Sequence, residues 1–164
     1  MVVIGIDPGL AIVGFGVIKS DRYGEYEVVD YGVIETPKQD SVPTRLVKIY
    51  EAMNTLIETY KPDALAIEEL FFNKNITTAI PVAEARGVIL LAAKQKLGKM
   101  YEYTPLQIKQ ALTGQGRAEK AQVQFMVKAI LGLKEVPKPD DAADAVAVAI
   151  CHLQTNNQLN DNMI

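Results

Sequence analysis

The chain has 164 residues and a formal net charge of −3, which suits one domain that buries a normal core without disulfides or a structural metal. One cysteine and one histidine exclude an internal disulfide and a Cys/His zinc cluster, so a bound metal would need carboxylate oxygens. No charged-then-apolar leader opens the sequence and no apolar run reaches the ~18 residues of a membrane span, so we expect a cytoplasmic protein without membrane contact.

The first half of the chain is predicted to hold four strands and one helix. Three short β-branched runs separated by turn signals predict an antiparallel meander. A stretch with apolar positions at three- and four-residue spacing predicts an amphipathic helix, and a run that is apolar on both faces predicts a central parallel strand. In chain order these segments are residues 2–9, 14–20, 26–36, 41–60 and 63–68.

The second half is predicted to be mostly helical, with one short strand at 99–103 and a loop at 70–78. The predicted helices cover residues 78–97, 104–112, 118–131 and 140–154. Together the elements indicate an α/β fold in which helices flank a mixed sheet. We expect one domain over residues 1–155 and a flexible C-terminal tail over 156–164.

The charges are segregated along the chain. Residues 73–138 hold 11 Lys and Arg against 4 Asp and Glu, whereas residues 1–72 hold 6 against 12, and residues 139–164 hold none against 4. A basic middle with acidic ends is the pattern of a nucleic-acid groove beside a carboxylate site. A solvated helical face with lysines for solubility explains the same excess about as well.

Two carboxylates stand at the ends of predicted strands. Asp7 precedes the Pro8–Gly9 break, and taken alone it is better explained as a turn former. Glu68 ends the central strand, and neighbouring parallel strands end at one edge of a sheet, so the two carboxylates would meet there. Like charges at one edge repel unless a cation binds. Spacing cannot choose between Glu68 and Glu69, which would point to opposite faces of the strand.

The last predicted helix begins with further acids. Asp141 and Asp144 are three residues apart and share a face, with Asp140 beside them. Acids in a first helical turn also stabilise the helix dipole and cap it, and for these residues alone capping is the better explanation. His152 lies about 12 Å beyond Asp144 along the helix, too far to join the site. We interpret His152 and Cys151 as structural residues.

Several short motifs run in order along most of the chain. They read GIDPG, GFGVI, AIEELF, KN, ARGV, QIKQ, GQGRAEKAQV and DAADAVAVAI, between residues 5 and 150. In this order they resemble the RuvC family of bacterial Holliday-junction resolvases, in the RNase H-like superfamily. The resemblance implies an RNase H-like mixed five-stranded sheet, antiparallel over strands 1-2-3 and parallel over strands 1-4-5, flanked by helices.

The resemblance also implies a catalytic metal centre. Its four ligands would be Asp7, Glu68, Asp141 and Asp144. We expect two Mg²⁺ about 3.5–4 Å apart, bridged by Asp7, with Mn²⁺ as a substitute. The resemblance places Lys109 and Lys120 near the scissile phosphate, with Lys120 also stabilising the transition state. It makes Phe71 a platform for an unpaired base, although burial beside a strand end explains Phe71 and Phe72 equally well from the residues alone.

The implied activity is a crossover junction endodeoxyribonuclease that makes paired nicks in four-way junctions during recombination and repair, leaving 5′-phosphate and 3′-hydroxyl ends. Two symmetric cuts need two sites, so we expect a homodimer, with helix 78–97 as its candidate interface. The RuvA and RuvB branch-migration proteins are the implied partners. The alternatives are a catalytically inactive junction-binding module and an actin- or sugar-kinase-like ATPase, a fold that duplicates its domain and leaves no room in 164 residues.

Overall fold

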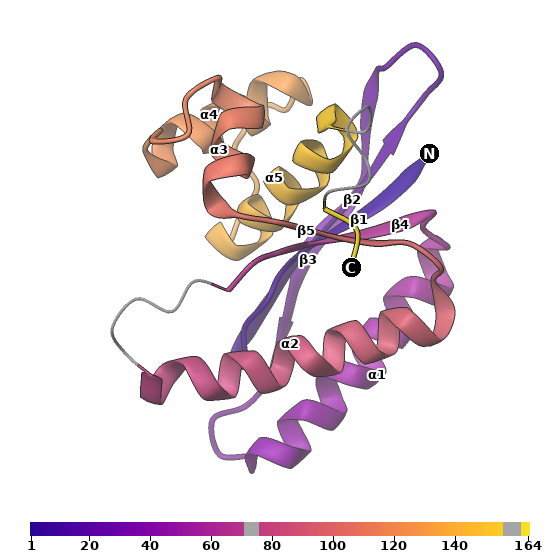
Figure 1. Cartoon of the computed structure of the whole chain (residues 1–164), viewed down its shortest axis with the longest axis vertical. Coiled ribbons are helices and arrows are strands. Elements are labelled where there is room, and N and C mark those ends of the chain that lie inside the picture. Colours follow the sequence, from indigo (N-terminus) through magenta and orange to yellow (C-terminus); the bar gives the residue numbers. More distant parts are fainter. Residues whose placement is uncertain (71–75, 156–161) are drawn as a thin grey trace.

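The computed structural model describes residues 1–70, 76–155 and 162–164. Its centre is a five-stranded sheet in the order β3-β2-β1-β4-β5 (Figure 1). The strands are β1 (Val2–Asp7), β2 (Ile12–Ser20), β3 (Tyr26–Glu35), β4 (Ala64–Glu68) and β5 (Met100–Tyr103). β1, β2 and β3 pair antiparallel, whereas β1, β4 and β5 pair parallel. The predicted mixed sheet and its strand order are therefore confirmed.

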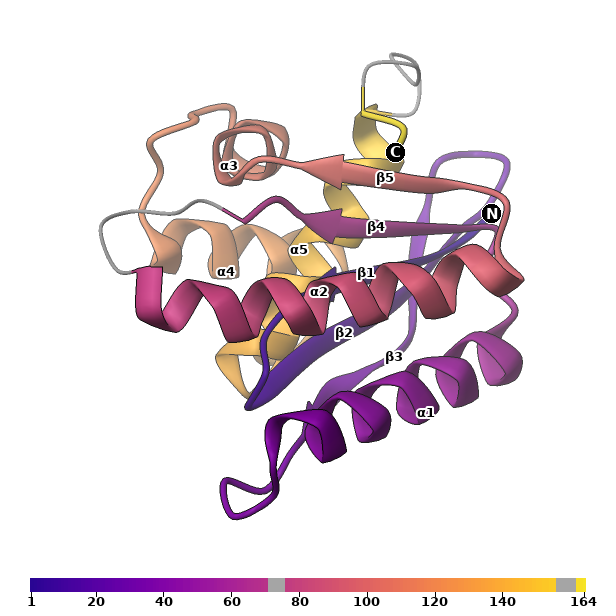
Figure 2. The same ribbon diagram turned by 60° about the horizontal axis from the view of Figure 1, so that its bottom comes forward.

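Helices cover both faces of the sheet. The helices are α1 (Val42–Tyr60), α2 (Ile76–Lys96), α3 (Pro105–Thr113), α4 (Lys120–Ile130) and α5 (Asp140–Thr155). α1 and α2 lie on one face and α3, α4 and α5 on the other (Figure 2). The sheet has a hydrophobic core on each face, and successive residues of a strand point alternately into one core and the other. Val3 lies in the core with α5 residues, and Ile4 lies in the core with α1 and α2 residues. In the part of the chain that the structure describes, no helix is long and apolar enough to cross a membrane.

α5 lies directly on β1 and β2 because glycines in these strands leave room for it. A Cβ atom on Gly5 would lie 2.2 Å from the carbonyl oxygen of Ala145, and one on Gly14 would lie 2.0 Å from that of Asp141. Gly14 pairs with Asp7 across the antiparallel ladder. The close contact therefore brings the acidic first turns of α5 to the carboxyl end of β1.

The helix boundaries lie within two residues of the predicted ones. Thr104 caps α3 with a capping box to Gln107, and Pro105 occupies the first turn as predicted. α2 begins at Ile76, inside the segment predicted as a loop, and continues through Pro81. The start of this segment carries no apolar period by which to place the boundary.

The last three residues pair with the edge of the sheet. Met163 forms an antiparallel bridge with Tyr101, the backbone N–H of Glu102 donates to the carbonyl of Asn162 (2.8 Å), and that of Ile164 donates to Met100 (3.0 Å). The sequence predicts a flexible tail over 156–164. Residues 156–161 lie outside the described residues, but 162–164 differ from the prediction because they satisfy backbone groups of an edge strand.

Candidate active site

Asp7 and Glu68 end the neighbouring parallel strands β1 and β4. The register pairs Ile6 with Ile67, so the next residue on each strand is one of these carboxylates. Burial and then the negative charges of Glu68 and Asp144 raise the pKa of Asp7 to about 8. Burial and the charge of Asp144 raise the pKa of Glu68 to about 7. Both carboxylates are held where ionisation is costly.

The first turns of α5 supply two more carboxylates. The charge of Asp141 contributes to the raised pKa of Asp7. The pKa of Asp144 is itself raised by burial, although a hydrogen bond from Lys120 and the positive charge of that lysine oppose the rise. Strands β1 and β4 and helix α5 thus bring four acidic side chains into one electrostatic neighbourhood.

Two lysines face part of this cluster across a pocket of about 290 Å³. The polar residues that line the pocket are Glu68, Lys109, Lys120 and Asp144. The Nζ atom of Lys120 lies 2.9 Å from Oδ2 of Asp144 and 3.2 Å from Oδ2 of Asp140. Burial alone would lower the pKa of Lys120, but hydrogen bonds and attraction to the two aspartates outweigh burial and raise it. Lys120 therefore carries a positive charge at neutral pH.

The donor chemistry of this edge suits a divalent metal ion. Carboxylate oxygens are the ligands that Mg²⁺ prefers, and the raised pKa values of Asp7, Glu68 and Asp144 mean that a cation would relieve their repulsion. Within the described residues, no three His, Cys, Asp or Glu side chains lie close enough together to hold an ion as they stand. Like charges spread apart unless a cation lies between them, so metal binding would require these side chains to draw together.

Glu68 and Glu69 face different sides of the sheet, as strand alternation requires. Glu68 lines the pocket with the two lysines, whereas Glu69 lines a separate hollow with Arg86 and Glu102. Arg86 and Glu102 form an ion pair with each other. The structure thus shows which of the two glutamates lies beside the lysines, a choice that spacing in the sequence could not make.

Asp141 borders a different hollow from Asp144. This hollow, of about 720 Å³, lies beside the turn that follows Asp7, and its lining includes Gly9, Lys38 and Arg45. Asp141 is therefore not brought onto the pocket wall that carries Lys109 and Lys120, and the acidic cluster is open on two sides.

The remaining candidates divide between the core and the undescribed part of the chain. Phe71, proposed from the resemblance to stack on a base, lies outside the described residues, as does Phe72. His152 and Cys151 are fully buried in α5, and Nδ1 of His152 shares a 2.7 Å hydrogen bond with the Tyr103 hydroxyl. These two residues are structural, as predicted.

Neither ion pair of Lys120, with Asp144 or with Asp140, follows from the sequence. Asp140 is the first residue of α5, and its Oδ1 also accepts a hydrogen bond of 3.2 Å from Nε2 of Gln124. Lys120 and Gln124 are four residues apart on α4, so they lie on one helical face and reach the same carboxylate. Their spacing was the one available signal, and it did not identify the partner across the two helices.

The chain is similar to one protein family in both sequence and structure. A family model described as "Crossover junction endodeoxyribonuclease RuvC" matches residues 3–152. A protein of that description from Caldicellulosiruptor saccharolyticus is 53% identical over 159 residues, covering 97% of this chain and 96% of the relative. The solved Thermus thermophilus RuvC structure superimposes with a TM-score of 0.92 at 36% identity, with both chains fully covered. A second structure, T. thermophilus RuvC in complex with Holliday junction substrate, gives 0.90 at 34% identity, again with full coverage.

Proposed function

The chain belongs to the RuvC family of crossover junction endodeoxyribonucleases, and from this premise we propose how it resolves Holliday junctions. The scissile phosphate lies at the carboxylate edge of the sheet, between the ends of β1 and β4 and the lysines of α3 and α4. The observation that carries this proposal is the pairing of Asp7 and Glu68, with raised pKa values, with Lys109 and Lys120 close by. Carboxylates with perturbed pKa values beside positive charge mark a candidate site for metal-assisted phosphoryl transfer.

The metal centre belongs to this proposal. The residues that would hold Mg²⁺ are Asp7, Glu68, Asp141 and Asp144. Two ions per site are expected, with Mn²⁺ as a substitute. When bound, such ions supply an activated water and neutralise charge on the leaving oxygen. The support from this chain is the all-oxygen donor set and the repulsion that a cation would relieve.

The lysines have a separate task. Lys109 and Lys120 would bind the scissile phosphate, since ammonium groups neutralise phosphate charge. Lys120 is held beside Asp144 at 2.9 Å, which would keep its ammonium at the pocket, where it could stabilise the charge that grows on the phosphate during attack. Water adds to phosphorus as the bond to the 3′-oxygen breaks, which leaves 5′-phosphate and 3′-hydroxyl ends. Phe71 would stack on an unpaired base beside the site.

Two symmetric nicks require two active sites, and each chain carries one. A homodimer with two-fold symmetry meets this requirement. α2 is the proposed interface, and its apolar Ile80 and Leu91 side chains are 56% and 53% exposed, which favours burial against a second copy. RuvA and RuvB, acting on the same junction in the cytoplasm, are the proposed partners.

A synthetic mobile four-way junction tests the proposal. The wild-type chain, incubated with the junction and Mg²⁺, should give paired nicks at symmetric positions, and the products should be ligatable. Asp7→Asn should bind the junction with unchanged affinity and fail to cut it. Cleavage by Asp7→Asn at a rate near wild type would refute the carboxylate assignment. Wild-type binding without cleavage would favour a non-catalytic junction-binding module.

A further inference from the structure

The hollow that Asp141 borders carries two basic side chains that the proposed reaction leaves unused. Lys38, from the segment between β3 and α1, and Arg45, from the first turn of α1, line it together with the Gly9–Leu10 turn. Lys38 is exposed and Arg45 is partly buried. The hollow is thus an open concave surface with positive charge next to the active-site turn.

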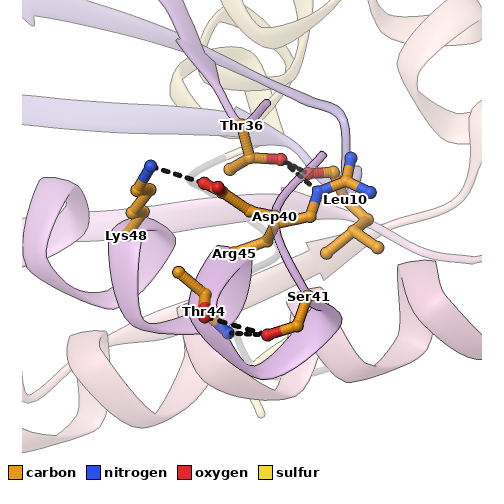
Figure 3. Close-up of polar contacts among 7 residues, drawn as sticks. All are labelled: Leu10, Thr36, Asp40, Ser41, Thr44, Arg45 and Lys48. Atoms are coloured by element: carbon orange, nitrogen blue, oxygen red, sulfur yellow. Dashed lines mark hydrogen bonds and ion pairs between the residues drawn. The ribbon is translucent and has the colours of Figure 1, made fainter. Parts of the chain in front are cut away.

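Arg45 is held in place by a buried hydrogen-bond chain (Figure 3). Its Nε donates to Oγ1 of Thr36 at 2.8 Å, and the Thr36 hydroxyl donates to the carbonyl oxygen of Leu10 at 2.6 Å. Thr36 is only 6% exposed. The guanidinium is therefore fixed to the turn that follows Asp7, and within the described residues both Nη groups are left to bind a ligand.

The positive charges of Arg45 and Lys38 are available to a ligand. Among the residues that the structure describes, neither Arg45 nor Lys38 forms an ion pair, whereas Lys48 on the same helix pairs with Asp40 at 2.5 Å. An anchored guanidinium with free Nη groups matches the geometry of a phosphate oxygen pair. The chemical class of ligand that fits is a phosphate diester.

The position of the hollow gives that phosphate a place in the substrate. Lys109 and Lys120 lie on the α3–α4 side of the acidic cluster, and Arg45 lies on the α1 side, beyond Asp141. A DNA strand that crosses the cluster would meet positive charge before and after the scissile phosphate. We propose that Lys38 and Arg45 form a second phosphate-binding site, which holds the DNA backbone on the α1 side of the cut. This inference rests on the proposed function.

The test measures junction binding without cleavage. Fluorescence anisotropy with a labelled four-way junction in EDTA compares wild type, Arg45→Gln, Lys38→Gln and the matched control Lys48→Gln. Arg45→Gln and Lys38→Gln should each weaken binding by about two- to tenfold and lower the salt slope, log Kd against log salt, by about 1. Lys48→Gln should change neither quantity, because its charge is already paired with Asp40.

A neutral backbone linkage locates the contact. Methylphosphonates placed one at a time around the cleavage position should weaken wild-type binding at one linkage beyond those that Lys109 and Lys120 contact. At that linkage Arg45→Gln should show no further loss. Lys38→Gln makes the test independent of folding, since Lys38 is exposed and takes no part in the Thr36 hydrogen-bond chain.

The outcomes separate the inference from the function on which it rests. If wild type cuts junctions, but Arg45→Gln and Lys38→Gln keep wild-type affinity and salt slope, the second phosphate site is refuted and the endonuclease stands. If wild type neither binds nor cuts junctions, the proposed function fails first. Equal weakening by Lys48→Gln would also overturn the inference, because the effect would then be general charge loss.

Discussion

A Cβ atom on Gly14 would lie 2.0 Å from the carbonyl oxygen of Asp141, so β2 and the first turn of α5 meet with no room for a side chain. Both contacting groups are backbone, which cannot move aside cheaply. Gly14→Ala should destabilise the fold by about 1–3 kcal/mol through overpacking, and it should reduce cleavage by displacing Asp141 from Asp7. Urea unfolding and junction cleavage measure the two effects.

Gly98→Ala provides the control for this substitution. A Cβ atom at Gly98 meets nothing within 4 Å and its backbone is not in the left-handed region. We expect its stability and cleavage rate to match wild type. If Gly14→Ala were as stable and active as Gly98→Ala, the close contact of β2 with α5 would not position the acidic turn.

The raised pKa of Asp7 predicts that Asp7→Asn, which we propose abolishes cleavage, is more stable than wild type. The folded-state pKa of about 8 lies above the ordinary value of 3.8, so the folded chain holds this proton more tightly than the unfolded chain. Wild-type stability should therefore fall as pH rises from about 4 to about 8.

At pH 8 in EDTA, Asp7→Asn should exceed wild type by about 1–3 kcal/mol, since one pKa unit is worth about 1.4 kcal/mol and neighbouring carboxylates relax in part. The difference should shrink to a small fraction of this near pH 4, close to the ordinary pKa of 3.8, where Asp7 is protonated in the folded chain and partly protonated in the unfolded chain. Urea unfolding at the two pH values measures it. If Asp7→Asn were less stable than wild type at pH 8, the pKa of Asp7 would not be raised by burial and by the neighbouring carboxylates.

As proposed metal ligands, Asp7 and Glu68 should set the pH dependence of metal binding. Mg²⁺ binds ionised carboxylates, and ionisation of Glu68 and Asp7 is complete only above their pKa values of about 7 and about 8. Mg²⁺ affinity should therefore rise between pH 6 and pH 8.5, by up to about tenfold per pH unit for each proton released. Calorimetric titration in two buffers of different ionisation enthalpy counts these protons. Affinity that is flat over this range would show that the acids are already ionised.

Glu68 and Glu69 form a matched pair for testing the site. Glu68 lines the pocket with Lys109 and Lys120, whereas Glu69 lies in the hollow with Arg86. Glu68→Gln should lower the single-turnover cleavage rate at least about a hundredfold, and Glu69→Gln should stay close to wild type. Both should bind the junction in EDTA as wild type does. A large loss with Glu69→Gln alone would reverse the assignment.

The sequence predicts the sheet well because its signals are local. Strand period, turn residues and the apolar run ending in Glu68 each act within a few residues, and the observed strands follow them. The resemblance singled out the glycine-rich motifs around Asp7 and Gly14, but their physical reason lies in α5, more than a hundred residues away. No local pattern reveals a contact between distant backbones.

The electrostatic details were equally hidden from the sequence. The first-turn acids of α5 suggest helix capping, yet Asp140 pairs with Lys120 of another helix. The anchoring of Arg45 by Thr36 depends on a loop and a helix folding around the Leu10 carbonyl. Such partners are set by tertiary packing, so only the structure identifies them.

Lys120 is held by two ion pairs. Its ammonium contacts the partly buried Asp144 and the more exposed Asp140, whose side chain is 67% exposed. If metal ions engage Asp144, its attraction for Lys120 weakens, and Asp140 remains to keep the ammonium at the pocket. Lys120→Ala should therefore lower cleavage by about a hundredfold, and Asp140→Asn should lower it several-fold without changing stability, since exposed ion pairs contribute little.

A double-mutant cycle decides whether Asp140 acts through Lys120. In the Lys120→Ala background, Asp140→Asn should have no further effect on single-turnover cleavage, because the group it orients is gone. Gln124→Ala, which frees the other oxygen of Asp140, should weaken cleavage less than Asp140→Asn does. Additive losses from Lys120→Ala and Asp140→Asn would mean that Asp140 acts on the metal or the DNA directly.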